Sequence, residues 1–272
     1  MIVRTNRELK ASYNELTAGD IFIGNLSSKF LKQPMLIDML ERGIHCLPSP
    51  LAQILNSSKV AQAFVLHEWM LPHTQTISRR TDLIDAINTF GKNGIGPVVS
   101  KQDGLHCGHG IRRWETIETL YSFMALAESS YPFVLQPFHE GFTDIRVIIA
   151  GDYVESYTRS NPYNFRVNLS LGGTGSPYKL DEKKEAFCRS AMQRGKFPFA
   201  HLDLMILENG ECYLSEITLN GGIKGARIGR EELEEKKNDL LNHINKNEIA
   251  GQINDIEKEL TRKKEEKQNR EK

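Results

Sequence analysis

Two hairpin signals in the second half of the chain constrain its fold more than any other feature. The run LDLMILENGECYLSEIT, residues 202–218, places two apolar segments around an Asn-Gly pair at 209–210. This is the strongest short-range hairpin signal, because both turn residues accept positive φ. The run DIRVIIAGDYVESYTRS, residues 144–160, has the same form around a Gly-Asp pair at 151–152. We therefore expect antiparallel sheet in this part of the chain.

The first hairpin predicts a pair of facing carboxylates. With 209–210 as the loop, Glu208 pairs with Glu211, and Asp203 lies directly opposite Glu216. Two such carboxylates between apolar neighbours repel each other unless they share a proton or a cation lies between them. Mg²⁺ is commonly bound by one or two carboxylates together with substrate phosphates. The residues indicate either a divalent metal site or an acid pair at a solvated sheet end.

The second hairpin aligns two arginines with polar partners on one side of the sheet. Asp144 faces Arg159 and Arg146 faces Tyr157 when Gly151-Asp152 is the turn. A cross-strand ion pair with a purely structural role is one interpretation of Asp144 and Arg159. Contact with an anionic ligand is the other.

A polar loop follows this hairpin at residues 164–173, with the sequence NFRVNLSLGG. It combines the charge of Arg166, the amide of Asn168 and a Gly-Gly pair at 172–173. Such a cluster suits contact with phosphate oxygens, although on its own it is only a loop.

A glycine-rich loop begins after the β-like run PVVSK at 97–101. Its spaced glycines are Gly104, Gly108 and Gly110. Glycines let backbone N–H groups approach phosphates, and Lys101 at the strand end supplies a compact positive charge. The spacing matches neither common phosphate-loop motif, so a flexible surface loop is the alternative. We interpret His106 and His109 as loop residues, because no second ligand cluster accompanies them.

The remaining segments predict an α/β start and a charged tail. Residues 21–23, 33–41 and 45–47 indicate strand, helix and strand, with a further helix opening at Pro48 and Pro50. Further helices are expected over 59–69 and 82–90, and a buried strand over 133–138. From residue 229 onward, Glu, Lys, Asn and Gln dominate. We expect a solvated helix with a narrow apolar stripe there, or a coiled-coil dimer as the sharper alternative.

Composition excludes several classes of protein. Lys plus Arg and Asp plus Glu are both 35, so net charge gives no argument for nucleic-acid binding, and no nucleic-acid partner is expected. No apolar run reaches the roughly 18 residues of a membrane span, and we expect a cytoplasmic protein without membrane contact. The cysteines show no zinc or disulfide spacing, so we expect free thiols. They are Cys46, Cys107, Cys188 and Cys212.

The order of these features resembles the ATP-grasp superfamily, specifically its RimK-like carboxylate–amine ligases, which are similar to glutathione synthetases. The motifs are Lys59 opening a helix, LPHT, VVSK with its glycine loop, FVLQPF, DIRVIIAGDYV, TRS, NFRVNLSLGG, LDL and SEITLNGG. They cover roughly residues 57–226. The resemblance implies an α+β ATP-grasp fold of two subdomains with ATP between them. It also implies a division into a short α/β leading domain at 1–56, an ATP-grasp domain at 57–228 and a charged helical tail at 229–272.

The resemblance also implies a role for individual residues. Implied to bind ATP are Lys59, Lys101, Gly104, Gly108, Gly110, Gln136, Pro137, Phe138, Asp144, Arg166 and Asn168. Implied at the phosphate and acceptor-carboxylate region, with catalytic roles, are Arg146, Arg159 and Arg166. Implied to bind Mg²⁺, or alternatively Mn²⁺, are Asp203, Glu216 and Asn220.

The chain departs from the family pattern at three places. Thr218 stands where the family usually has a metal-binding Asn, so Asn220 is the alternative ligand. Pro137 replaces the usual hinge acid and leaves only neighbouring backbone groups. The leading domain is short, and a sheet trimmed to two strands is expected.

Three functions are compatible with this sequence. The first is an ADP-forming carbon–nitrogen ligase that makes an amide through an acyl phosphate, from a small carboxylate and amine or from a peptide or protein terminus. The second is an ATP-grasp phosphotransferase acting on a hydroxyl. The third is a nucleotide-binding regulatory or scaffold protein without turnover, whose C-terminal helix binds a partner or a second copy of the chain. Lys224 fits either an acceptor pocket or a solvated turn.

Overall fold

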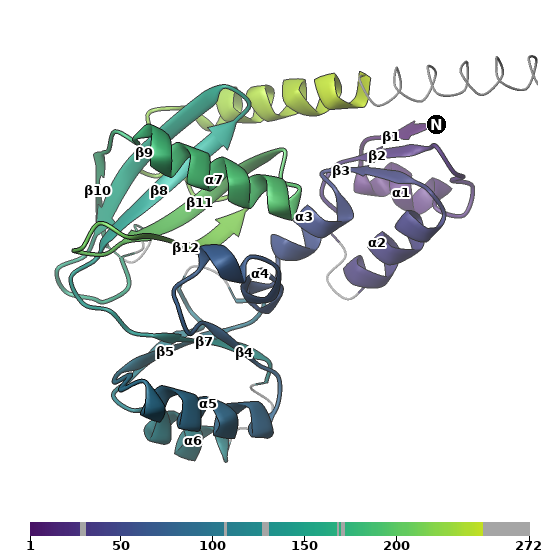
Figure 1. Ribbon diagram of the computed structural model, residues 1–272. Coiled ribbons are helices and arrows are strands. Elements are labelled where there is room, and N and C mark those ends of the chain that lie inside the picture. Colours follow the sequence, from purple (N-terminus) through teal and green to yellow (C-terminus); the bar gives the residue numbers. More distant parts are fainter. Residues whose placement is uncertain (28–30, 106–107, 127–130, 168, 170–171, 247–272) are drawn as a thin grey trace, which may run out of the picture.

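The computed structural model describes residues 1–27, 31–105, 108–126, 131–167, 169 and 172–246, and its strands form three separate sheets (Figure 1). The first is a parallel sheet of β1 (Ile2–Val3), β2 (Ile21–Ile23) and β3 (His45–Leu47), packed with α1 (Asn6–Ser12) and α2 (Lys32–Glu41). The predicted α/β start is therefore confirmed. The expected trimming to two strands is wrong, because Ile2 and Val3 supply a third strand that is too short to give a periodic signal.

The second sheet is antiparallel and carries helices on one face. Its order is β4 (Gln75–Ile77), β7 (Phe133–Pro137), β5 (Val98–Gln102) and β6 (Ile111–Trp114). The helices α5 (Arg80–Lys92) and α6 (Ile117–Met124) bury Leu83, Phe90 and Leu120 against it. Figure 1 shows both helices on the face that points away from the rest of the molecule. The other face is left for the site.

The third sheet is the largest, and the main core packs against it. Its order is β10 (Thr174–Pro177), β9 (Tyr153–Ser160), β8 (Thr143–Ala150), β11 (Phe199–Ile206) and β12 (Cys212–Thr218). The helices α3 (Pro50–Leu55) and α7 (Glu182–Gly195) belong to this core. The second and third sheets confirm the expected α+β class with two antiparallel units.

The predicted register of both hairpins can be compared directly with the sheet. The β8–β9 register is confirmed throughout, from Asp144 opposite Arg159 to Ala150 opposite Tyr153. In the β11–β12 hairpin, Asp203 does lie opposite Glu216. The predicted pairing of Glu208 with Glu211 is wrong, because Leu207 N–H donates to the Glu211 carbonyl at 2.9 Å and makes the loop one residue longer. A bulge between Asp203 and Leu204 then restores the predicted pair.

The helix over residues 230–246 packs on the third sheet. Leu233 and Leu241 are buried, and the Lys237 ammonium lies over the Phe199 ring at 5.1 Å. For these residues the expected helix with a narrow apolar stripe is confirmed, because few of its positions are buried and most of its side chains are exposed. Its packing against the third sheet was not predicted. The coiled-coil alternative depends on residues 247–272, which lie outside the described residues.

The short helix α4 (Lys59–Val65) joins the second and third sheets. Its Gln62 side chain donates to the Ile217 carbonyl at 2.8 Å and accepts from the Ile217 N–H at 3.0 Å, and so pairs with β12 as a neighbouring strand would. Asp103 accepts from the Val60 N–H at 3.1 Å and from the Ser58 hydroxyl at 3.0 Å, which ties the helix start to the loop after β5. Lys59 is thereby fixed between the two sheets.

Two further expectations concern cysteines and membranes. Cys46, Cys188 and Cys212 are free thiols, and Cys107 lies outside the described residues. Across the part of the chain that the structure describes, no helix has the length and apolar character needed to cross a bilayer.

Candidate active site

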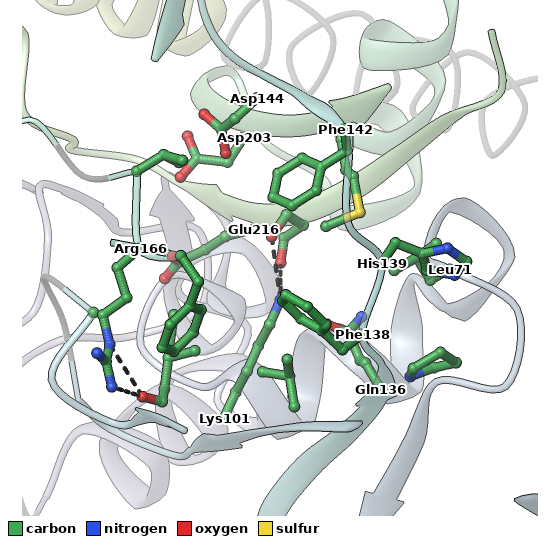
Figure 2. Close-up of a pocket in the computed structure, with 18 of the residues that line it drawn as sticks. Leu71, Lys101, Gln136, Phe138, His139, Phe142, Asp144, Arg166, Asp203 and Glu216 are labelled. Atoms are coloured by element: carbon green, nitrogen blue, oxygen red, sulfur yellow. Dashed lines mark hydrogen bonds between the residues drawn. The ribbon is translucent and has the colours of Figure 1, made fainter. Parts of the chain in front are cut away.

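A pocket lies between the free face of the second sheet and the third sheet. Its empty space is about 850 Å³ when the open solvent at its mouth is included. The predicted site residues that line it are Lys59, Lys101, Gly108, Gln136, Pro137, Phe138, Asp144, Arg159, Arg166, Asp203 and Glu216. These residues come from segments far apart in the sequence, and Figure 2 shows several of them pointing toward a common space.

The pocket has an apolar part and a charged part. Leu71, Val99, Phe142 and Met205 supply apolar lining that the sequence analysis did not identify as site residues. No sequence pattern marks these residues as part of a site, because each is an ordinary apolar residue of a strand or loop. Asp144, Asp203 and Glu216, on β8, β11 and β12, lie on the other side of the pocket from Gln136 and Phe138 (Figure 2).

Two lysines reach the charged part from different elements. Lys101, on β5, donates to the Ser215 hydroxyl at 3.1 Å and to the Ser215 carbonyl at 3.3 Å. Lys59, on α4, pairs with Glu216 at 3.2 Å and donates to the Leu105 carbonyl. Burial lowers the pKa of Lys101 to about 8, with nearby Glu216 opposing the shift and Lys59 adding to it.

The third sheet carries a buried network of two arginines and two aspartates. Arg146 binds Asp203 through two nitrogens, with Nη2 to Oδ2 at 3.0 Å. Arg159 lies between Asp144 at 2.6 Å and Asp203 at 2.9 Å. The expected ion pair of Asp144 and Arg159 is therefore present. Arg159 also binds Asp203, the residue predicted as a metal ligand.

The two aspartates differ in their electrostatics. Burial disfavours both charges, but Arg146 and Arg159 together hold the pKa of Asp203 down to about 2. Asp144 has only Arg159 as a close partner, so burial prevails and raises its pKa to about 6. Asp203 is the firmly ionised member of the pair.

Arg146 itself does not line the pocket. Its Nη1 donates to the Gly222 carbonyl at 3.1 Å, and the Tyr157 hydroxyl donates to the same oxygen at 3.3 Å. A side chain at Gly221 would lie 2.5 Å from Arg146 and 2.9 Å from His201. Arg146 thus holds the glycine segment after β12 against the network.

The glycine-rich loop connects β5 to β6, and only part of it faces the pocket. Gly108, at φ +78°, lines the pocket, whereas Gly104 and Gly110 do not. A Cβ on Gly110 would lie 2.8 Å from the Gln102 Cβ, so close packing within the loop requires that glycine. His109 belongs to this loop and lies on the side of the sheet that α6 covers, and His106 lies outside the described residues.

Aromatic rings and arginines connect the two sheets at the pocket. Arg113 of β6 lies over the Phe138 ring at 4.3 Å, Phe138 meets Phe165 edge-on at 6.2 Å, and Arg166 lies over Phe165 at 4.4 Å. The Arg166 guanidinium donates twice to the Ile111 carbonyl, with Nε at 3.1 Å (Figure 2).

One predicted ligand lies away from the pocket lining, and another lies outside the described residues. The side-chain amide oxygen of Asn220 accepts from the Lys237 ammonium of the C-terminal helix at 2.8 Å, and Asn220 is not among the residues lining the pocket. Asn168 lies outside the described residues.

The comparisons with known proteins match this geometry. A family model for the RimK-like ATP-grasp domain matches residues 56–239, about two thirds of the chain. The chain belongs to the RimK-like ATP-grasp family. This is a family of ATP-binding ligases, and the resemblance drawn from the sequence is confirmed. A search of curated proteins finds no significant match.

Solved structures with the ATP-grasp fold are similar to this chain at low identity. D-alanyl-alanine synthetase A from Vibrio cholerae is 14% identical, with a TM-score of 0.55, over 82% of this chain and 77% of the other. D-alanine–D-alanine ligase from Bacillus anthracis, complexed with ATP, is 15% identical, with a TM-score of 0.60, over 90% and 85%. A RiPP-associated ATP-grasp ligase from Chryseobacterium gregarium, in complex with ADP and a leader and core peptide, is 14% identical, with a TM-score of 0.54, over 78% and 67%.

The ATP-grasp site has a donor set that fits Mg²⁺ when substrate phosphates complete it. Asp203 and Glu216 face each other, and one or two carboxylates suffice for this ion beside phosphates. Glu216 uses one oxygen for Lys59, while both oxygens of Asp203 accept from guanidinium nitrogens. Among the described residues there is no group of three or more His, Cys, Asp or Glu placed to hold a metal. Glu216 is therefore the more available ligand.

Proposed function

We propose that this ATP-grasp protein is a carbon–nitrogen ligase that uses ATP and Mg²⁺ to join a carboxylate to an amine. The observation that carries the proposal is the convergence of Lys59 and Lys101 on the Ser215-Glu216 segment, beside an apolar recess. A nucleotide needs apolar walls for its base and cations for its phosphates. Both are present in one pocket.

The proposed reaction has two steps. A carboxylate oxygen of the first substrate attacks the γ-phosphorus, the bond from that phosphorus to the β–γ bridging oxygen breaks, and ADP leaves. The amine nitrogen then attacks the acyl carbon of the acyl phosphate. Phosphate leaves with the electrons of the carbon–oxygen bond, and the nitrogen gives up a proton to form the amide.

The residues of this chain contribute mainly position and charge. We assign the nucleotide phosphates to Lys59 and Lys101, and the developing phosphoryl charge and the substrate carboxylate to Arg159 and Arg166. Arg146 acts on the reaction through Asp203 and the Gly222 carbonyl, which it holds. Arg146 does not line the pocket, so we assign it a positioning role in place of the catalytic role that the resemblance implies.

Glu216 and Asp203 would hold Mg²⁺ with the nucleotide phosphates. When bound, the ion would neutralise phosphate charge and orient the γ-phosphoryl group. To coordinate the ion, Asp203 would have to give up one of its contacts with Arg146 or Arg159.

The two substrates are proposed only as chemical classes. A peptide is one candidate, because the similar Chryseobacterium ligase is described in complex with a leader and core peptide. Small carboxylates and amines are the other candidates. The division into residues 1–56, 57–228 and 229–272 and association of two copies through the tail are also retained as proposals.

A nucleotide-binding protein without turnover is the second candidate. The specific observation in its favour is that the predicted metal ligands already have protein partners, with Asp203 held by two arginines and Asn220 by Lys237. In that case nucleotide would bind without needing Mg²⁺.

Calorimetric titration with a non-hydrolysable ATP analogue, with and without Mg²⁺, separates these candidates. Binding that strengthens with Mg²⁺, followed by ADP release in the presence of carboxylate and amine pairs, would support the ligase. Equal binding in both conditions with no ADP release would favour the protein without turnover. Absence of binding at millimolar analogue would overturn both.

A further inference from the structure

The helix over residues 230–246 carries a buried charge in the middle of its apolar face. Lys237 is only 3% exposed, and it lies between Leu233 and Leu241, which are buried hydrophobic residues of the same helix. A lysine is almost never buried to this extent unless its ammonium is paired. Because an apolar side chain of similar volume would pack here without the cost of burying a charge, stability alone does not account for this lysine.

The Lys237 ammonium is surrounded by acceptors from two elements. It donates to the side-chain oxygen of Asn220 at 2.8 Å and to Glu234, one turn earlier in the helix, at 2.9 Å. It also lies over the Phe199 ring at 5.1 Å. Glu234 is an exposed residue of the same helix, so the hydrogen bond to Asn220 is the one that ties the ammonium to another part of the fold.

Asn220 belongs to residues 219–222, a segment that directly follows β12 and is held at both ends. The first N–H of this segment donates to the Asn56 side chain at 2.7 Å, and its last carbonyl accepts from Arg146 at 3.1 Å. Lys237 supplies the hold between these two points. Because Asn220 is exposed, the hydrogen bond to Lys237, and not burial, fixes its side chain.

One face of β11 leads from the C-terminal helix to the pocket. Side chains two positions apart on a strand share a face, so Phe199, His201 and Asp203 lie on the same side of the sheet. Lys237 covers Phe199, and the backbone of Gly221 covers His201, where an added Cβ would lie 2.9 Å from the ring. Asp203 lines the pocket. Helix, glycine segment and pocket therefore follow one another over about 13 Å of strand.

The glycine segment also contacts the arginine that holds Asp203. A Cβ at Gly221 would lie 2.5 Å from Arg146, so the backbone packs directly on the guanidinium. Arg146 donates to the Gly222 carbonyl and binds Asp203 through two nitrogens. A continuous series of contacts thus leads from Lys237 to a candidate metal ligand. If the segment moved, Arg146 would lose an acceptor and its hold on Asp203 would change.

We propose that Lys237 is a positioning residue of the active site and acts through Asn220. By holding Asn220 it fixes residues 220–222, and thereby the orientation of Arg146 and Asp203. Asn220 is then an anchor of the glycine segment, in place of the metal-binding role that the resemblance implies. The C-terminal helix becomes part of the catalytic unit. The proposal rests on the proposed function, since it assumes that Mg²⁺ and nucleotide phosphates bind in the pocket.

The test measures how much Mg²⁺ strengthens the binding of a non-hydrolysable ATP analogue, by calorimetric titration of the full chain. Lys237→Met keeps the length of the side chain and removes its donor. Its stability in urea should equal that of wild type, because both former acceptors can turn to water. The strengthening by Mg²⁺ should nevertheless fall by at least about threefold. Lys236→Met makes the same change at the neighbouring, more exposed lysine and should leave it unchanged.

The direction of the change distinguishes an anchor from a metal ligand. If Asn220 were a ligand that Lys237 holds back, Lys237→Met would release it, and a larger effect of Mg²⁺ would overturn the proposal. An effect equal to that of wild type would overturn it as well. The double variant Lys237→Met with Asn220→Ala should behave like Asn220→Ala alone, because both changes remove the same hydrogen bond. Additive losses would contradict action through Asn220.

Asn220→Ala provides a second route if Lys237→Met does not fold, because position 220 is exposed. It should lower the effect of Mg²⁺ by at least about threefold, and an unchanged effect would overturn the anchor. If wild type binds the analogue without any response to Mg²⁺, or does not bind it, the proposed function fails and the role of Lys237 fails with it. If wild type responds to Mg²⁺ and Lys237→Met responds equally, only the role of Lys237 fails.

Discussion

Asp203 and Glu216 face each other across β11 and β12, yet each carboxylate is neutralised by a different set of cations. Asp203 is held by two arginines of its own sheet, whereas Glu216 is paired with Lys59 of α4. One member of the pair is therefore embedded in a rigid network, and the other meets a side chain from a neighbouring helix. The two acids should respond differently to substitution.

For Glu216→Gln we expect the strengthening of nucleotide binding by Mg²⁺ to fall by about tenfold or more, because an amide lacks the charge that a hard cation prefers. The measurement is calorimetric titration with the ATP analogue at several Mg²⁺ concentrations. Glu235→Gln, an exposed change of the same chemistry on the C-terminal helix, is the control. Unchanged Mg²⁺ dependence in Glu216→Gln would refute the metal assignment.

Arg146→Ala should reduce the free energy of unfolding by about 3–5 kcal/mol, because it leaves the buried Asp203 with one guanidinium fewer and the Gly222 carbonyl with one donor fewer. Urea denaturation measures this loss. The double variant with Asp203→Asn should recover part of it, since the uncompensated charge is then removed. A loss below about 1 kcal/mol would show that Arg146 is not the anchor described above.

Nucleotide affinity should decline as pH rises through about 8, because burial lowers the pKa of Lys101 to about 8 and the charged form binds phosphate. Dissociation constants between about pH 6.5 and 9.5 test this. Lys101→Arg keeps its charge throughout that range, so its pH profile should be flat by comparison. If the wild-type affinity varied as little with pH as that of the arginine variant, Lys101 would not lose its charge in this pH range.

His201 should make the protein sensitive to acid. It is 2% exposed, both ring nitrogens lack hydrogen-bond partners among the described residues, and burial together with Lys237 and Arg146 lowers its pKa to about 3. Between about pH 6.5 and 3 the unfolded chain binds a proton there that the folded chain does not, so stability is lost as pH falls.

Replacement of His201 by Leu removes this linkage. The difference in unfolding free energy between His201→Leu and wild type should shift by about 2 kcal/mol in favour of the variant when the pH falls from 7 to 5. The exposed His67→Gln serves as the control, and denaturant unfolding at both pH values gives the comparison. A difference from wild type that stays constant with pH would contradict the prediction.

The sequence predicted those parts of the fold that depend on local signals. The β8–β9 register follows from a Gly-Asp turn and strict alternation, and it is confirmed residue by residue. The β11–β12 register was predicted with a loop one residue too short. The acid pair was still correct, because the longer loop and the bulge shift the register in opposite directions. Neither shift leaves a clear signal in composition.

The parts that could not be predicted depend on contacts between distant segments. The pairing of Asp203 with both Arg146 and Arg159 needs three strands side by side, and neither of those pairs lies within a hairpin. The packing of residues 230–246 against the third sheet was not predicted, because a lysine usually marks a solvated face. Here Lys237 is buried in contact with Asn220 and the Phe199 ring. The hydrogen bond from the Gln136 side chain to the Thr74 hydroxyl joins residues 62 positions apart, and no local pattern predicts it.

The bulge in β12 brings two neighbouring side chains to the same side of the strand. In a regular strand neighbouring side chains point to opposite faces, so only one of Ser215 and Glu216 would reach a cavity on one side. Here both line the pocket, with Leu214 and Ile217 buried on either side of them. Two consecutive positions thus give a hydroxyl to Lys101 and a carboxylate to Lys59. Deleting Ser215 would remove more than a hydroxyl, because the strand would regain its alternation and one lysine would lose its counterpart.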